Sequence, residues 1–259
     1  MHEVTVLAMD GVVAMEMAMP GQILGSAESE QGEPLYRVRV CGPAEGVTAH
    51  AAGSSQFRLL PPHDLPELLR ASTVIVPAHE TTEPVPPKIL DLLRRAHSSG
   101  ARMASICTGA GILAEAGLLD GRTAATHWRH AADLARLHPL VRFDPVALFI
   151  DDGDVLTGAG VTAGIDLCLH LVRSDHGAAV AARAARRIVS APWRDGGQAQ
   201  FIAREEIGLA SGDLAGTMHW MLERLDEPLT LEQIAAQARL SLRTLNRRFL
   251  SRTGVAPMR

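Results

Sequence analysis

The residue best placed to do chemistry is Cys107, which lies between an apolar strand pattern at Ala101–Ile106 and a helical pattern at Thr108–Ala116. Gly109 and Gly111 follow it closely. A sharp strand-to-helix turn needs small neighbours and lifts its central side chain to the carboxyl edge of a parallel sheet, where open α/β folds bind ligands. Because the thiol would face a helix amino terminus, we expect the thiolate to be favoured. A buried, unreactive cysteine is an equal alternative from the local residues alone.

The two other cysteines lie in patterns typical of a hydrophobic core. Cys41 ends an alternating strand, and Cys168 lies in a helical pattern between Leu167 and Leu169. Three cysteines without a CxxC pair or zinc-ligand spacing argue against a disulfide scaffold. We therefore predict no metal and no cofactor.

A second group with chemical potential is the arginine-rich end of the chain. Residues 239–259 hold six arginines and no acidic residue, which leaves 19 basic and 29 acidic residues in the remainder of a chain of net charge −4. An acidic body with a basic tail indicates local affinity for a polyanion. A solvated helix face is the other interpretation of such a charge run.

The pattern around these arginines predicts a helix-turn-helix. Thr230 is a good N-cap for a first helix, Arg239-Leu240 forms a tight turn, and Ser241 caps a second helix whose apolar positions are Leu242, Leu245 and Phe249. The other faces of the second helix carry the candidate contacts to double-stranded DNA: Arg243, Thr244, Asn246, Arg247, Arg248 and Arg252. We expect Arg243, Thr244 and Arg247 to face the major groove, and Arg248 and Arg252 to meet phosphates.

The remaining chain alternates strand and helix patterns, which predicts an α/β fold with a parallel sheet flanked by helices. The predicted strands are Val4–Met9, Tyr36–Cys41, Thr73–Pro77, Ala101–Ile106 and Thr123–Thr126. The predicted helices are one within Gly11–Gly25 and those at Pro87–Ser98, Thr108–Ala116, Ala163–Ser174 and Gly177–Val189. We place an α/β domain at 1–190, a linker at 191–212 and a helical segment at 213–259. The sequence has no signal-peptide pattern and no membrane-length apolar run, so we expect a cytoplasmic protein.

Several motifs, in one order over nearly the whole chain, resemble AraC-family transcription regulators with an amino-terminal PfpI-type domain. These motifs are Ala104–Ala110, Leu113–Arg122, Thr126–Trp128, Thr157–Leu167 and Gly196–Phe201, followed by the helix-turn-helix pattern with Thr253-Gly254 and Pro257. The resemblance implies a flavodoxin-like, amidotransferase-type sheet for the first part. It also implies two helix-turn-helix units joined by a long helix. Since the sequence ends at Arg259, near the start of that joining helix, we expect only the first unit.

The resemblance implies a ligand pocket near the turn, formed by Cys107, Thr108, Glu16 and His127, with Ala78 and His79 beside it. Two departures argue against peptidase chemistry. PfpI-type peptidases carry His directly after the nucleophile, where this chain has Thr108, and the usual Gly-Gly pair after the third strand is replaced by Ala78-His79. The second change puts a preformed oxyanion hole in doubt.

We therefore expect a homodimeric regulator in which a small nitrogenous metabolite, bound near Cys107, changes the DNA-binding tail. Cys107, Thr108 and Glu16 also resemble the residues of isonitrile hydratases, although those enzymes carry Asp where this chain has Glu16. An isonitrile hydratase-like or amidase-like enzyme with a vestigial DNA-binding tail is therefore the alternative. A redox-responsive protein that uses the Cys107 thiol is a third.

Overall fold

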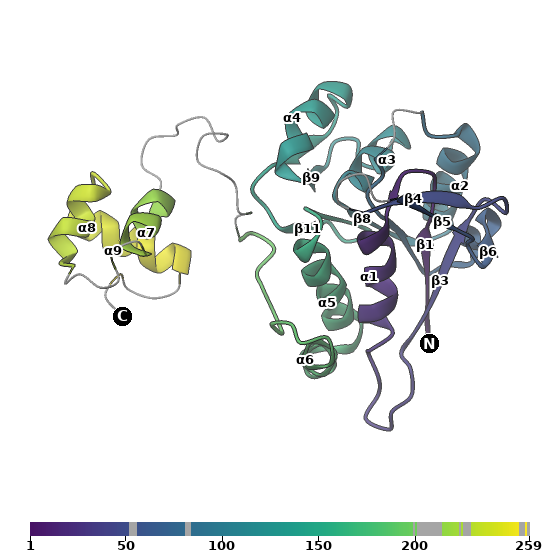
Figure 1. Ribbon diagram of the computed structural model, residues 1–259, viewed down its shortest axis with the longest axis horizontal. Coiled ribbons are helices and arrows are strands. Elements are labelled where there is room, and N and C mark those ends of the chain that lie inside the picture. Colours follow the sequence, from purple (N-terminus) through teal and green to yellow (C-terminus); the bar gives the residue numbers. More distant parts are fainter. Residues whose placement is uncertain are drawn as a thin grey trace. The chain divides into compact units, whose positions relative to one another are not determined.

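The chain forms two units in the computed structural model, Met1–Gln200 and Phe201–Arg259 (Figure 1). The structure describes residues 1–51, 56–80, 84–198, 200, 214–222, 224, 229–253 and 257. Among the described residues, no helix combines the length and the apolar character that crossing a membrane requires.

The first unit is built on a seven-stranded sheet, and every pair of neighbouring strands is parallel except the pair at one edge. In spatial order the strands are β11 (Phe149–Asp151), β12 (Val155–Gly158), β8 (Arg102–Ile106), β7 (Thr73–Val76), β1 (His2–Leu7), β3 (Tyr36–Gly42) and β6 (His63–Asp64). The central strands β7 and β8 are short apolar runs covered on both faces, which is typical of parallel sheets. The predicted α/β class is confirmed.

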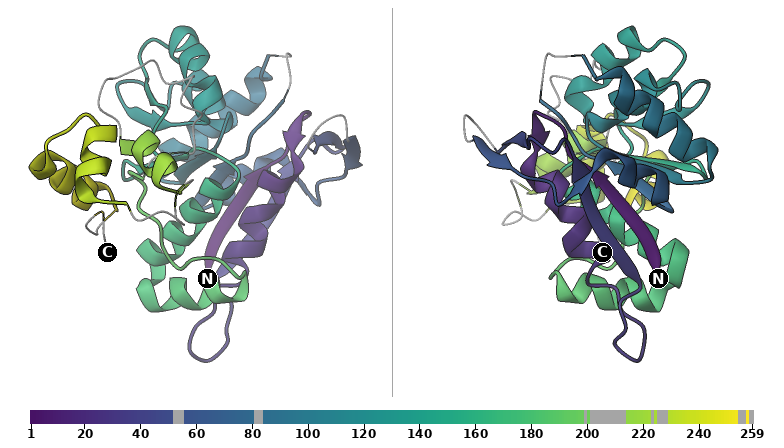
Figure 2. Two further views of the ribbon diagram at one scale, coloured as in Figure 1. Left: turned by 60° about the vertical axis from the view of Figure 1, so that its left-hand side comes forward. Right: turned by 90° about the vertical axis from the view of Figure 1, so that its right-hand side faces the viewer.

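Helices cover both faces of this sheet and enclose two separate cores (Figures 1 and 2). One face carries α1 (Ala14–Leu24), α5 (Thr162–His176) and α6 (Ala178–Arg187). The other carries α2 (Pro87–Ser98), α3 (Gly109–Glu115) and the 3₁₀ helix η1 (Leu65–Arg70). The apolar spacing in Pro87–Ser98 predicted the bounds of α2 correctly, because its five buried residues form one stripe.

The α/β unit also contains several shorter strands and a further helix. A three-stranded sheet combines β2 (Val12–Val13), β4 (Val47–His50) and β5 (Gln56–Leu59). A parallel pair joins β9 (Thr123–Ala125) and β10 (Arg142–Asp144), and α4 (Trp128–Leu137) lies between them in the chain. β9 matches the predicted strand at Thr123–Thr126. The other four strands were not predicted, because they have only two to four residues, which is too short for an alternating pattern to be recognised.

The α/β unit ends ten residues later than the predicted bound of 190. Residues 191–200 belong to it, and the carbonyl oxygen of Gly196 accepts hydrogen bonds from the amides of Leu148 (2.7 Å) and Phe149 (3.2 Å). A Cβ at Gly196 would lie 2.6 Å from the carbonyl oxygen of Phe149. Gly196 therefore permits a close backbone contact within the α/β unit. The rest of the predicted linker, 201–212, lies outside the described residues.

The second unit contains α7 (Leu214–Leu222), α8 (Leu231–Gln237) and α9 (Leu242–Thr253). Its core consists of Leu214, Ile234, Ala235, Leu245 and Phe249. These residues come from all three helices, so α8 and α9 pack on α7 rather than on each other alone.

Candidate functional site: a thiol and a carboxyl group at the carboxyl edge of the sheet

Cys107 occupies the sharp turn between β8 and α3. Its φ is 56°, in the left-handed region that residues other than glycine rarely adopt, and its amide donates to the carbonyl oxygen of Gly158 at the end of β12 (2.7 Å). Strain of this kind is typical of a nucleophile elbow. The predicted position of Cys107 at the carboxyl edge of the sheet is confirmed.

Glu16, in the first turn of α1, lies against this thiol. Its side chain is buried, and its two carboxylate oxygens accept hydrogen bonds from the amides of Ala78 (3.1 Å) and Val161 (2.9 Å). It is also hydrogen-bonded to the Cys107 side chain. Burial raises the pKa of Glu16 above its ordinary value, although the three hydrogen bonds oppose that rise. The carboxyl group thus bonds the segments that follow β7 and β8 and the start of α5.

The thiol of Cys107 is the neutral form at physiological pH, and the expectation of a favoured thiolate is wrong. Burial, and then the charge of Glu16, raise its pKa to about 12. The hydrogen bond from the Thr108 amide lowers the pKa but does not outweigh these effects. A helix amino terminus alone would favour the thiolate, but here burial and the carboxylate from α1 oppose ionisation.

Two glycines allow the backbone to approach this pair closely. A Cβ at Gly160, whose φ is +101°, would lie 2.5 Å from the Cβ of Cys107 and 3.0 Å from a carboxylate oxygen of Glu16. A Cβ at Gly109 would lie 2.2 Å from the carbonyl oxygen of Val76. Side chains at these positions are therefore excluded by the geometry of the site.

The two residues after Pro77 are hydrogen-bonded to residues of the site, Ala78 to Glu16 and His79 to Thr108. The Thr108 hydroxyl accepts a hydrogen bond from the His79 amide (3.2 Å) and donates one to the His79 carbonyl oxygen (3.3 Å). The Ala78 amide is bonded to Glu16. Both amides that follow Pro77 are thus already paired, and using them for a developing oxyanion would require breaking these bonds.

The His79 imidazole is a neutral group beside the site. Its Nδ1 lies 2.8 Å from the carbonyl oxygen of Pro77, and its Nε2 is buried without a hydrogen-bond partner among the described residues. Burial lowers the pKa of His79 to about 4. With the proton on Nδ1, the Nε2 atom is an acceptor.

His127 lies at the amino end of α4, after a residue that contacts Cys107. The Thr126 hydroxyl donates to the carbonyl oxygen of Cys107 (2.9 Å). The His127 ring accepts from the Arg129 amide (3.3 Å) and stacks on Trp128, with ring centroids 5.5 Å apart. Its pKa is lowered, mainly by burial. The bonded group of Cys107, Glu16 and Thr108 does not include His127 within the part of the chain that the structure describes.

The sequence did not single out Val161, Gly160, Thr126 and Gln200, although each lies in a quoted motif. Val161 has a φ of 46° at the start of α5 and directs its amide at Glu16. The signal available was the Gly-Ala-Gly run before α5, since consecutive small residues permit close backbone contacts.

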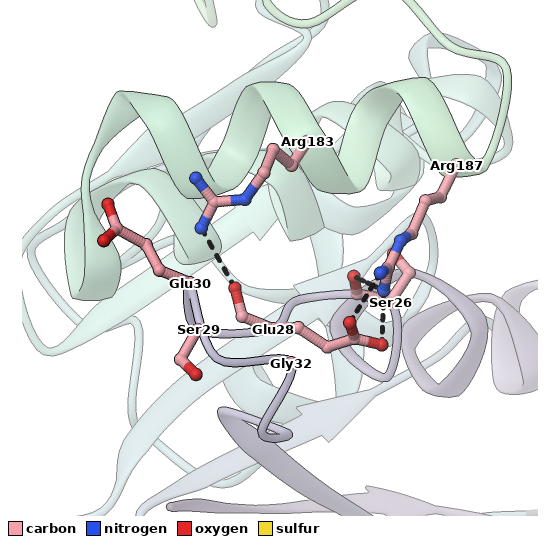
Figure 3. A pocket seen from close by; sticks show the side chains of 7 residues that line it. All are labelled: Ser26, Glu28, Ser29, Glu30, Gly32, Arg183 and Arg187. Atoms are coloured by element: carbon pink, nitrogen blue, oxygen red, sulfur yellow. Dashed lines mark hydrogen bonds and ion pairs between the residues drawn. The ribbon is translucent and has the colours of Figure 1, made fainter.

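A separate cleft of about 400 Å³ lies between α6 and the loop that follows α1 (Figure 3). Arg187 is paired with the Glu28 carboxylate and bonds the Ser26 carbonyl oxygen (3.1 Å), and Arg183 donates to the Glu28 carbonyl oxygen (3.1 Å). Both guanidinium groups therefore already fasten the loop to α6, and the cleft is not adjacent to Cys107.

The second unit forms the predicted helix-turn-helix. Thr230 and Gln233 make a capping box at the start of α8, with the Thr230 amide bonded to the Gln233 side chain at 2.7 Å. Arg239 takes a φ of 52° in the turn. The Ser241 hydroxyl accepts from the Thr244 amide (3.3 Å) and so caps α9, as predicted.

The predicted DNA contacts differ in their surroundings. Arg243 and Arg247 are exposed, whereas Thr244 and Asn246 are half-buried. The Thr244 hydroxyl is hydrogen-bonded to Ser241 (2.9 Å) and thus takes part in the cap. Leu242, predicted to be a core position, is 40% exposed because it lies in the first turn of α9, beside the cap. The side chains of Arg248 and Arg252 lie outside the described residues.

Comparison with known proteins gives two kinds of relative. The 245 residues aligned with the HTH-type transcriptional regulator GlxA of Rhizobium meliloti are 30% identical and cover 93% of this chain and 74% of that protein. The HTH-type transcriptional regulator ArgR of Pseudomonas aeruginosa is 33% identical over 70% of this chain and 55% of its own length, so the chain spans about half of that regulator. An isonitrile hydratase of Pseudomonas putida is 39% identical over 84 residues, 32% of this chain and 36% of the enzyme.

Solved structures agree on the fold. An AraC family transcriptional regulator from Pseudomonas putida matches 73% of this chain and all of that chain with a TM-score of 0.62 at 21% identity. Drosophila melanogaster DJ-1beta matches 73% of this chain and 98% of that one with a TM-score of 0.60 at 19% identity. The model of the DJ-1/PfpI family matches residues 2–174. The chain therefore belongs to the DJ-1/PfpI family, and its relatives include HTH-type transcriptional regulators.

Proposed function

We propose that this chain is a transcription regulator, in which the α/β unit binds a small effector at the Cys107 site and the helix-turn-helix binds double-stranded DNA. The observation that carries the proposal is α9, a capped helix after a tight turn, with Arg243 and Arg247 exposed near its amino end. In a helix-turn-helix, this end of the second helix contacts base edges. The similarity to GlxA supports it, because the 7% of the chain outside that alignment is too short to contain the whole second unit.

The features of the Cys107 site support ligand binding more than catalysis. Its thiol is neutral and 8% exposed, and the two amides after Pro77 are paired within the protein. A buried carboxyl group and a neutral acceptor at His79 favour a ligand with polar hydrogens, and we propose a nitrogenous metabolite. Binding as a homodimer would give the two-fold symmetry that paired half-sites require.

The test is binding of the full chain to DNA from its own upstream region at 50 and 200 mM salt. We expect a sequence-preferring complex that weakens roughly 100-fold over this range, as about four phosphate contacts would produce. The Arg243→Ala/Arg247→Ala variant should lose the preference for its site, since each bidentate contact to a base contributes about 1–3 kcal/mol. An Arg136→Ala/Arg142→Ala variant of the α/β unit removes the same charge and should keep it. Equal binding of all DNA by every form would refute the proposal.

The isonitrile hydratase relative supports a second candidate function. In that reaction water adds across the isonitrile carbon, R–N≡C + H₂O giving R–NH–CHO, so a proton must reach the carbon. Cys107 keeps its proton at neutral pH and is hydrogen-bonded to the Glu16 carboxyl group, so the two groups together support a role in passing a proton to the carbon. Formation of an N-substituted formamide from an alkyl isonitrile, lost in Cys107→Ala, would establish the enzyme. If no formamide forms at millimolar isonitrile, this second candidate is excluded and the regulator proposal stands alone.

A further inference from the structure

The side chain of Gln200 fastens the end of the α/β unit to the segment beside the Cys107 turn. Its Nε2 donates to the carbonyl oxygens of Thr126 (2.9 Å) and Ala147 (3.0 Å), and its Oε1 accepts from the amide of Trp128 (3.1 Å). Its own amide donates to the carbonyl oxygen of Val146 (2.9 Å). Both amide hydrogens and the amide oxygen are used, so only one orientation of this side chain satisfies its surroundings.

Thr126 connects Gln200 to the Cys107 turn through two hydrogen bonds. The hydroxyl of Thr126, which is fully buried, donates to the carbonyl oxygen of Cys107 (2.9 Å), while the Thr126 carbonyl oxygen accepts from Gln200. His127, which lies between the two backbone groups that Gln200 holds, is a predicted wall of the effector site. A shift of this segment therefore changes both the Cys107 turn and the Gln200 contacts.

Gln200 also has a particular place in the chain. It is the last residue of the α/β unit, and Phe201 begins the second unit. The carbonyl oxygen of Gly196, four residues earlier, accepts hydrogen bonds from the amides of Leu148 and Phe149 and holds the same stretch of chain in place. Whatever displaces Gln200 thus acts on the point from which the DNA-binding unit continues.

We propose that Gln200 is a positioning residue of the effector site and couples its occupancy to the start of the DNA-binding unit. The inference rests on the proposed function. An effector that displaces residues 126–128 breaks the hydrogen bonds of Gln200, because its planar amide cannot keep three fixed partners when two of them move. Coupling is reciprocal, so loss of the Gln200 contacts must also loosen the Cys107 turn.

The reciprocal effect can be measured without knowing the effector. We expect Gln200→Ala to raise the rate of alkylation of Cys107 by iodoacetamide about tenfold, with the modified peptides resolved by mass spectrometry. Gln198→Ala is the matched control, because Gln198 is two residues away and exposed, and should leave the rate unchanged. Cys41 and Cys168 are fully buried elsewhere and report global unfolding. An equal rise at all three thiols, or none at Cys107, would overturn the proposal.

The forward effect uses the alkylated protein as an effector mimic. Adding a carboxamidomethyl group to the Cys107 thiol should speed hydrogen exchange of the Trp128 amide at least fivefold in the wild type and change DNA affinity at least threefold. In Gln200→Ala both differences should disappear. If no form binds DNA, the regulator proposal fails, while exchange at Trp128 still decides the role of Gln200. Unchanged exchange in the alkylated wild type would refute the coupling whatever the DNA result.

Discussion

The Cys107 thiol should ionise only in strongly alkaline solution, and Glu16 should be one of the reasons. A thiol with a pKa of about 12 is roughly 10⁻⁴ ionised at pH 8, whereas one at the ordinary 9.0 is about a tenth ionised. Because the thiolate is the reacting form, alkylation of Cys107 at pH 8 should be about 1,000-fold slower than that of a free thiol, before any steric protection.

Replacing Glu16 by Gln removes the charge next to this thiol. At an effective dielectric of about 20, a unit charge at hydrogen-bonding distance interacts by roughly 4 kcal/mol. The amides of Ala78 and Val161 partly neutralise the carboxylate, so we take about 1.4 kcal/mol as the part felt by the thiol, or about one pKa unit. The thiolate fraction, and hence the alkylation rate, should then rise about tenfold.

The assay is the pH profile of Cys107 alkylation by iodoacetamide between pH 6 and 10 in wild type and Glu16→Gln. The rate in the wild type should rise tenfold per pH unit over the whole range, and the variant should run parallel and above it. Circular dichroism checks that the variant remains folded, because its amide can accept only one of the two backbone hydrogens. A plateau beginning near pH 7 would refute the reasoning, since it requires a stabilised thiolate.

Four further outcomes follow from contacts already described. Gly160→Ala places a methyl group 2.5 Å from the Cβ of Cys107, so it should lower the free energy of unfolding by more than 2 kcal/mol; Gly153→Ala, at a φ of +82° with open space around it, should cost only about 1–2 kcal/mol. His79 has a pKa of about 4 in the folded protein, below its ordinary 6.5, so its neutral form contributes fully to the free energy of unfolding above pH 6.5. This contribution falls by up to about 3 kcal/mol towards pH 4, and in urea unfolding the stability of His79→Gln should therefore decrease less steeply below pH 6.5. Cys41, Cys107 and Cys168 have pKa values raised to about 12, so these thiols should not change the free energy of unfolding below pH 9. Above pH 9 the free energy of unfolding should fall by up to about 1.4 kcal/mol per pH unit for each thiol, and a constant value in that range would contradict their burial. Thr230→Ala removes the capping box of α8 and should destabilise the second unit by about 1 kcal/mol, measured as lost helicity on heating; equal melting of variant and wild type would mean that the cap is not formed in solution.

The sequence predicted the elements whose patterns are long or complete. The helix at Pro87–Ser98 has a full apolar stripe, and the turn at Cys107 has a strand, a helix and small residues in order. Thr230 and Ser241 act locally, each through the backbone amide three residues ahead, so their capping roles could be recognised from the chain alone.

The ionisation of the site could not be predicted in this way, because it depends on residues far apart in the chain. Glu16 faces Cys107 only after β1, β7, β8 and β12 are assembled, and the contact of Val161 depends on a φ of 46° that no propensity favours. Gln200 likewise gave no local signal, since its three side-chain partners lie at the start of α4 and before β11, more than fifty residues earlier in the chain. Such contacts are properties of the tertiary structure rather than of the local sequence.

The two amides that bond the Glu16 carboxylate come much later in the chain, so the site around Glu16 can be completed only late during synthesis. Its partners lie 62 and 145 residues further along the chain. A ribosome adding about 5–20 residues per second extends the chain from Ala78 to Val161 in several seconds, and during this time Glu16 has only one of its two partners. The Cys107–Glu16 site is thus assembled late, after β1 and α1 have been made and nearly when α5 begins. A chain that stops before Val161 should leave the Glu16 carboxylate without its second amide partner, however well its first strands fold.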